Sequence, residues 1–167
     1  LLFYVGAEIG GSAWIVLYLQ RVLGVSTFAS SAGLSILWIF IMIGRYVNSV
    51  LGNKYSAVRL VTVSGIIGAI SGIALINTSN LTIVFILLGI TGLSLSGVFP
   101  NVMAEINRRD PAKIGTVTAV MTIGAAAGAA IFQWLMGITA DAFGLRVAFY
   151  IPAFLQLLEV GAFAYAV

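Results

Sequence analysis

Glu8 is the residue whose chemistry fits its surroundings least, because it lies in an apolar stretch that runs from Leu1 to Leu19. An ionised carboxylate is costly inside a membrane, and it is normally directed toward a cavity or a partner. At helical spacing, Tyr4 and Ser12 share its face, so two hydroxyls and a carboxyl point the same way. This stripe predicts a site that binds a proton or a solute. The alternative is a protonated Glu8 that only packs against a neighbouring helix.

Other polar and aromatic residues within apolar stretches could also meet a solute. Asn101 follows Pro100, which lacks a backbone donor and lets a helix bend. Asn101 therefore either hydrogen-bonds a solute or satisfies the backbone groups that Pro100 frees. Gln133 is strongly polar, and Trp38 offers an aromatic face on which a sugar could stack. Packing or a place at the membrane interface is the alternative for the tryptophan.

The composition requires a membrane around these residues. Hydrophobic residues make up 61% of the 167 and charged residues 8%, with a mean hydropathy of +1.14. A soluble domain carries about 25% charge. The sequence therefore predicts an all-α integral membrane protein, and the net charge of +3 needs no nucleic acid to explain it, since basic residues commonly flank membrane helices.

Several classes of chemistry lack their residues here. The chain has no cysteine and no histidine, which excludes disulfides and removes the commonest metal ligand and general base. It also lacks a phosphate-binding Gly-Lys-Ser/Thr loop and a cluster of carboxylates. We therefore expect no enzymatic activity, no metal and no cofactor.

Six apolar stretches with short connections predict a single transmembrane domain over residues 1–167. A stretch of about 20 apolar residues is long enough to cross a bilayer as a helix. The chain begins and ends inside apolar runs, which predicts a fragment of a longer chain. The expected helices cover about residues 1–20, 28–51, 58–76, 81–104, 114–139 and 145–167.

A weak internal repeat divides the domain at about residues 1–80 and 81–167. A polar turn with an arginine follows the second helix at residues 52–59 and the fifth at residues 139–146. Three helices separate the two turns, so the units would have opposite orientations in the membrane. Inverted repeats of two three-helix units are typical of secondary transporters.

Basic residues predict the orientation in the membrane. Six fall on one side and two on the other, which places the larger set in the cytoplasm of a plasma or inner membrane. Both ends of the chain are then cytoplasmic. The larger set is Arg45, Lys54, Arg59, Arg108, Arg109 and Lys113, and the smaller set is Arg21 and Arg146.

Several short motifs in this order resemble the Major Facilitator Superfamily, nearest to its fucose-permease-like members. The stretch from Phe3 to Glu8, with Gly11 and Trp14, resembles the seventh helix of that family. The loop motif after its eighth helix is similar to Gly44-Arg45, Lys54-Tyr55-Ser56 and Arg59-Leu60-Val61, although the usual acidic residue is absent. The last matches are Gly97-Val98-Phe99-Pro100-Asn101 and the run of Gly137, Asp141, Gly144, Arg146 and Phe149.

The resemblance implies the C-terminal six-helix half of a twelve-helix transporter, whose partner is the missing N-terminal half. It places the first and fourth helices at a central cavity and makes Arg45 a cytoplasmic gate residue, with an interfacial anchor as the alternative. It also places Glu159, the second intramembrane acid, on a peripheral helix, which favours a structural or snorkelling role. The loop-motif and gate residues are Gly44, Arg45, Lys54, Arg59, Asp141 and Arg146.

Together, these features predict proton-coupled secondary transport of a small polar solute, such as a sugar or related metabolite, by alternating access. The alternative is a non-transporting membrane receptor or assembly subunit that has kept the fold. The expected partners are the solute, protons and membrane lipid. Residues predicted to bind protons or solute are Glu8, Tyr4, Ser12, Asn101, Trp38 and Gln133.

Overall fold

The computed structural model is helical throughout the residues it describes, which are 1–109 and 113–166. Side chains at positions 106, 107, 109 and 166 are not described. The helices are α1 (Leu2–Leu23), α2 (Thr27–Leu51), α3 (Ala57–Ile76), α4 (Leu81–Leu95), α5 (Val98–Arg109), α6 (Ile114–Phe143), α7 (Leu145–Ala148) and α8 (Tyr150–Ala166). Within the described residues, six helical spans are long and apolar enough to cross a membrane, with α4 and α5 sharing one span and α7 and α8 another. The prediction of an all-α six-helix membrane protein is therefore confirmed.

Local residue chemistry sets where these helices begin and end. Ser56 caps α3 by accepting a hydrogen bond from the Arg59 amide, and Asn80 caps α4 in the same way. Gly24 ends α1 with φ of 67°, a left-handed conformation that glycine adopts without strain. Gly24 lies beyond the helix end expected near residue 20, since α1 continues to Leu23. Gly144 likewise ends α6, so Asp141 belongs to the last helical turn rather than to a loop.

The fourth span is broken rather than continuous. Turn geometry at Ser96 and Gly97 separates α4 from α5. Pro100 explains this position, because its missing N–H would have bonded the carbonyl of the residue four positions earlier, which is Ser96. The sequence predicted a bend at Pro100, and the structure places the break one turn before it.

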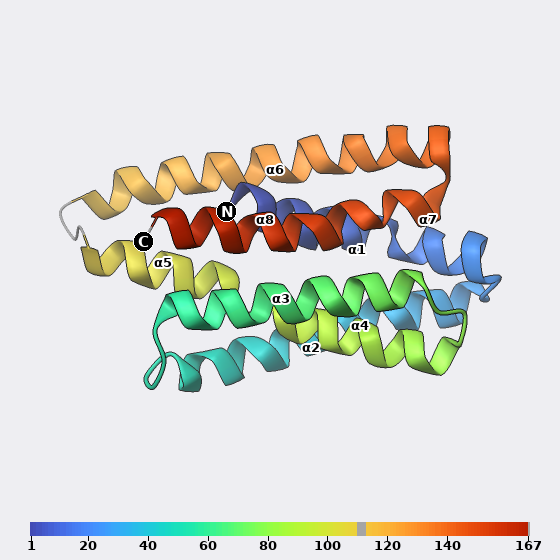
Figure 1. Cartoon of the computed structure of the whole chain (residues 1–167), viewed down its shortest axis with the longest axis horizontal. Helices are drawn as coiled ribbons and strands as arrows, with labels where there is room; N and C mark the ends of the chain where they lie inside the picture. Colours follow the sequence, from blue (N-terminus) through green and yellow to red (C-terminus); the bar gives the residue numbers. More distant parts are fainter. Residues whose placement is uncertain (110–112, 167) are drawn as a thin grey trace.

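The helix contacts correspond between the two three-helix units, so that each contact of α1 has a counterpart at α4. α1 packs on α6 as α4 packs on α2, and α1 packs on α8 as α4 packs on α3. Figure 1 shows the two chain ends close together, near the end of the bundle that carries the α2–α3 connection. The pattern is what inverted repeats would produce; the division near residue 80 stays a prediction.

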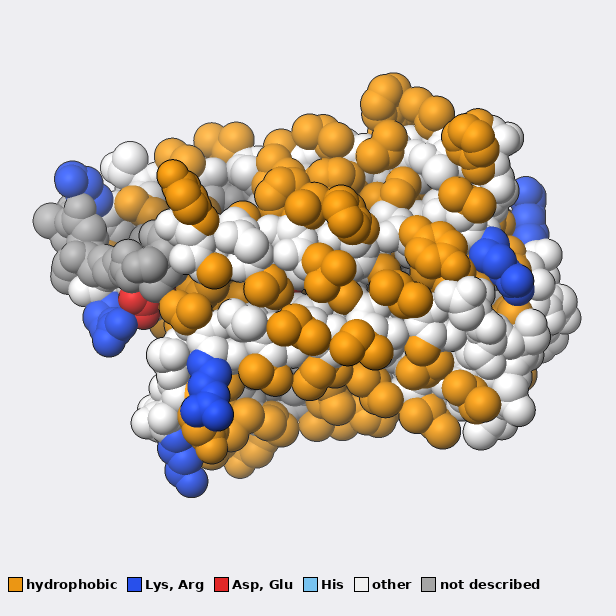
Figure 2. Space-filling view, in the orientation of Figure 1, with side chains coloured by type: hydrophobic (Ala, Val, Ile, Leu, Met, Phe, Trp, Pro, Cys, Tyr) orange, Lys and Arg blue, Asp and Glu red, His pale blue; other side chains and the backbone are white. Residues whose placement is uncertain are grey.

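The surface matches a bilayer environment. Figure 2 shows hydrophobic side chains across the middle of the visible face, with lysine and arginine at its two ends. α6 is the most exposed span, with 6% of its apolar window buried, against 50% for α1. A hydrophobic helix that is so exposed needs lipid or another protein segment to cover it.

Glycines bring the central helices close together. A side chain at Gly68 of α3 would overlap Gln156 of α8, and one at Gly72 would press on Ala153. Gly128 of α6 meets the backbone of Leu2 in the same way, whereas nothing lies near Gly124. Small residues permit this close approach of helices in membranes.

Candidate functional site

Glu8 is the centre of the candidate site. Its side chain is 7% exposed, and its Oε1 atom lies 3.6 Å from Nη2 of Arg45 on α2, whose side chain is 54% exposed. This separation exceeds the 2.7–2.9 Å that is typical of a charge-assisted hydrogen bond. The two residues therefore form a loose ion pair in which Glu8 is buried and Arg45 is half exposed.

Glu8 and Arg45 line an open cavity of about 420 Å³ together with Tyr4, Phe99 and Pro100. Arg45 and Pro100 also line a neighbouring cavity of about 430 Å³ at the end of α2, where Asn101 joins them. The break between α4 and α5 brings Phe99 and Pro100 to this place.

Asn101 is held by the helix break. Its Nδ2 donates to the Gly97 carbonyl oxygen at 2.7 Å and to Oδ1 of Asn48 at 3.4 Å. Asn48 Nδ2 in turn donates to the Gly44 carbonyl oxygen and to Oγ of Ser96, at 2.9 and 3.0 Å. Asn101 thus bonds the Gly97 carbonyl, which its own backbone amide also bonds, and not the Ser96 carbonyl that Pro100 leaves free. Its side chain also lines a cavity.

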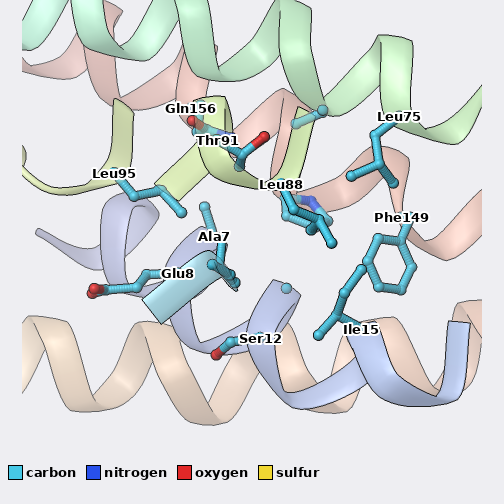
Figure 3. Close-up of a pocket in the computed structure, with 15 residues that line it drawn as sticks. Ala7, Glu8, Ser12, Ile15, Leu75, Leu88, Thr91, Leu95, Phe149 and Gln156 are labelled. Carbon is cyan, nitrogen blue, oxygen red and sulfur yellow. The ribbon is translucent and has the colours of Figure 1, made fainter. Parts of the chain in front are cut away.

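Ser12 lies deeper in the bundle than Glu8. It is 7% exposed, and its hydroxyl donates to the Ile9 carbonyl oxygen at 3.3 Å. It lines an internal cavity of about 50 Å³ that also touches Thr91 and Gln156. In Figure 3 the Glu8 carboxylate lies at the edge of this group, directed away from the apolar side chains. Ser12 and Glu8 therefore share a helix face and both line this cavity, and Glu8 also lines the open cavity with Arg45.

The two lateral candidates lie outside these cavities. Trp38 of α2 is 40% exposed, and Gln133 of α6 is half-buried. Neither lines the cavities at Glu8. Among the described residues, Trp38 and Gln133 lie on exposed helices and do not join Tyr4 and Glu8.

The loop-motif residues divide between two ends of the bundle. Gly44 lets α2 approach α4, since a side chain there would overlap Ser96 Oγ. Lys54 and Arg59 are exposed just beyond α2, with the Arg59 guanidinium 5.1 Å from the Tyr55 ring centroid. Asp141 and Arg146 are exposed beside Gly144, at the opposite end. Of the six, Arg45 alone lines the Glu8 cavity.

Glu159 is buried inside the bundle, contrary to the snorkelling role expected for it. It is 6% exposed, and neither carboxyl oxygen has a hydrogen-bond partner within the described structure. Its side chain fits against Gly65 of α3, where a Cβ atom would lie 3.4 Å from Glu159 Oε1. A peripheral helix can therefore direct an acid inward when the facing helix has a glycine.

Several residues that build the site have no role predicted from the sequence. Asn48, Ser96 and Phe99 complete the cavities or the helix break. Asn48 lies one turn from Arg45 in an apolar helix, and that signal could have identified it. Ser96 and Phe99 carry no comparable signal, because their role depends on how α2 and α5 meet.

The arrangement can exchange protons and reorganise charge. A carboxyl that takes a proton loses its attraction for a neighbouring guanidinium. Arg45 would then be released from Glu8 into the open cavity. Among the described residues, no group of acids, histidines or cysteines could hold a metal ion.

Comparisons with known proteins agree with this architecture. The sequence profile of the Major Facilitator Superfamily matches residues 1–166. Two solved structures of tetrameric PepTSo2, in space groups P4212 and I4, are similar to the chain, with a TM-score of 0.84 each and sequence identities of 18% and 17%. The matches cover 98% of this chain and 38% of each PepTSo2 chain. No curated protein matches the chain.

Proposed function

Because this chain belongs to the Major Facilitator Superfamily, we propose that it is one six-helix half of a secondary transporter. The full-length protein would move a small polar solute, such as a sugar or related metabolite, by alternating access coupled to protons. The exposed surfaces of α2 and α6 support a second half beside them, because apolar helices with so little internal burial need a cover.

The observation that carries this proposal is the Glu8–Arg45 pair at the wall of the open cavity. An ionisable residue inside the membrane is a functional candidate by default. The pair is loose, so a single proton on Glu8 is enough to release Arg45. A proton and a solute could then compete for, or cooperate at, the same cavity wall.

The neighbouring groups favour a polar solute. Tyr4, Arg45 and Asn101 supply hydroxyl, guanidinium and amide groups along two adjoining cavities. A hydroxyl-rich solute can exchange its water contacts for hydrogen bonds to such groups. Trp38 and Gln133 remain candidates for a surface that is completed by the other half.

The experiment is flux into proteoliposomes that contain the full-length protein, with radiolabelled monosaccharides as probes and an imposed proton gradient. Wild type should accumulate solute, and a protonophore should abolish the accumulation. Glu8→Gln should lose proton-driven accumulation and retain solute exchange, because the amide keeps the size of the carboxyl but cannot take up a proton. Ser79→Ala, at an exposed position between α3 and α4, is the control and should behave as wild type.

Two results would contradict the proposal. Normal coupling in Glu8→Gln would remove the acid from the mechanism. Solute binding without any flux in the wild type would favour the alternative, a receptor or assembly subunit that has kept the fold.

The proposed orientation has its own test. Cysteine introduced at Thr78, between α3 and α4, should react with an impermeant thiol reagent added to intact cells. Cysteine at Lys54, between α2 and α3, should react only after the cells are opened. The reverse pattern would place both chain ends outside.

A further inference from the structure

Four buried oxygens in the described structure lack a hydrogen-bond partner, and three residues carry all of them. They are Oη of Tyr4, Oε1 of Glu8 and both carboxyl oxygens of Glu159. Buried polar groups in proteins are nearly always paired, so each exception needs a physical reason such as an ordered water or an exchangeable proton. Here the exceptions are ionisable and belong to one region.

Tyr4 links the two acids. It lies one helical turn before Glu8 on the same face of α1, and its side chain is 1% exposed. Its hydroxyl interacts electrostatically with both Glu8 and Glu159, and the two carboxyls also interact with each other. The phenol therefore lies within electrostatic range of one acid from its own helix and another from α8.

The surroundings of Glu159 are built to hold an uncharged acid. Gly65 of α3 gives its carboxyl room, and Gln156 lies one turn earlier on the same side of α8. An ionised carboxylate without a partner is strongly unfavourable in such a place. Such surroundings favour the protonated form of Glu159, whereas Glu8 has Arg45 beside it.

We propose that Glu159 is a second exchangeable proton site, connected to Glu8 through the Tyr4 hydroxyl and bridging water. This inference rests on the proposed proton-coupled transport, and it adds a residue on α8 to the coupling machinery. In the transfer, the Glu159 carboxyl gives its proton to the oxygen of Tyr4 or a bridging water. The phenol or water gives its own proton to the Glu8 carboxylate, so Tyr4 ends as it began and Glu159 becomes the anion.

Few other charges act on this relay. On α1 they are Tyr4 and Glu8, both of which interact with Glu159. On α2, Arg45 acts through Glu8. The one ionisable side chain of α3, Arg59, is exposed at the helix start. Proton movement between the two acids would therefore shift Arg45, because the charge on Glu8 holds it.

Infrared difference spectroscopy of the full-length protein in liposomes tests the relay directly, because protonated carboxyls have their own C=O band. A pH titration should show two linked steps in wild type, as expected for interacting sites. Glu159→Gln should remove one protonated band and shift the titration of the Glu8 band. Tyr4→Phe should keep both bands and uncouple the two steps.

Matched controls separate the relay from general disturbance. Glu105→Gln removes an acid that is paired with Arg108 at 2.8 Å, and it should leave both linked steps in place. Tyr18→Phe removes a different buried hydroxyl of α1 and should also leave them unchanged.

Two outcomes would overturn the inference: an unchanged carboxyl titration in Glu159→Gln, or unchanged linkage in Tyr4→Phe. Tyr4→Phe decides the question if Glu159→Gln fails to fold. Linked steps in a protein that shows no flux would refute the proposed transport but leave the relay standing. Proton-coupled flux in a protein whose Glu159 does not titrate would refute the relay and leave the proposed transport standing.

Discussion

Two buried polar regions of this bundle differ in how many of their side-chain groups form hydrogen bonds. Where α2 meets the α4–α5 break, the amides of Asn48 and Asn101 bond to backbone carbonyls and to Ser96. Where α1 meets α8, the oxygens of Tyr4, Glu8 and Glu159 stay without hydrogen-bond partners in the described structure. The first region consists of neutral groups, and the second of ionisable ones.

A second neutral cluster follows the same rule. Ser71 of α3 and Thr91 of α4 share a hydrogen bond of 2.8 Å, and Ser94 donates to the Thr91 carbonyl oxygen at 2.7 Å. Gln156 of α8 joins this cluster through Ser94, at 3.4 Å. Neutral pairs therefore hold helices together, whereas the unpaired acids are available for proton chemistry. Substitutions in the two kinds of region should differ in kind: loss of stability in one, and loss of coupling in the other.

The largest effect on stability is expected for Gly44→Val. A side chain at this position overlaps Ser96 Oγ and lies near the Leu93 carbonyl oxygen, at the closest approach of α2 and α4. Such overpacking should lower the free energy of unfolding by about 3 kcal/mol. Unfolding in a titration with denaturing detergent measures it. Gly161→Val is the control, because nothing lies near Gly161 of α8; equal losses in the two variants would mean that overlap with Ser96 is not responsible.

Asn48→Ala should have the next largest effect. It removes three hydrogen bonds in a buried place, with the Gly44 carbonyl, Ser96 Oγ and the Asn101 amide. Leaving buried groups unpaired should lower the free energy of unfolding by about 2 kcal/mol. Asn53→Ala, at an exposed residue after α2, should change it by less than about 0.5 kcal/mol. A stable Asn48→Ala protein with defective transport would instead place Asn48 among the solute-binding residues.

The coupling energy of the Glu8–Arg45 pair should be small. Arg45 is half exposed and lies 3.6 Å from Glu8, and such pairs contribute under about 1 kcal/mol. A double-mutant cycle with Glu8→Gln and Arg45→Gln, read by the same unfolding titration, measures this term. We expect the same variants to abolish proton-driven accumulation. A coupling energy of several kcal/mol would make the pair a structural bridge and would break the contrast between the two regions.

The sequence was sufficient to predict six helices, since apolar length and the stops at Gly24 and Asn80 are local signals. Glu8 was equally visible, as a charge within an apolar run. The partner of Glu8 was not, because Arg45 lies on another helix and only the packing register of α1 and α2 brings them together. For Glu159 the sequence left a structural and a snorkelling role open; its burial could not be predicted, because the glycine that receives it, Gly65, lies on α3, far away in the sequence.

The smallest effect on stability, and the sharpest contrast, comes from two tyrosines of α1. Tyr4 and Tyr18 are both fully buried, but Tyr18 donates to the Ile76 carbonyl oxygen at 3.4 Å while the Tyr4 hydroxyl has no partner. Tyr18→Phe should therefore lower the free energy of unfolding by about 1 kcal/mol.

Tyr4→Phe removes a buried hydroxyl that forms no hydrogen bond, so the free energy of unfolding should change by less than about 0.5 kcal/mol. Proton-driven accumulation should nevertheless fall in this variant and stay normal in Tyr18→Phe. Unfolding titrations and flux measured on the same two preparations compare both properties directly. If Tyr4→Phe destabilised the protein as much as Tyr18→Phe and transported normally, Tyr4 would belong with the paired structural groups. The region of Tyr4, Glu8 and Glu159 would then not differ in kind from the hydrogen-bonded region at Asn48 and Asn101.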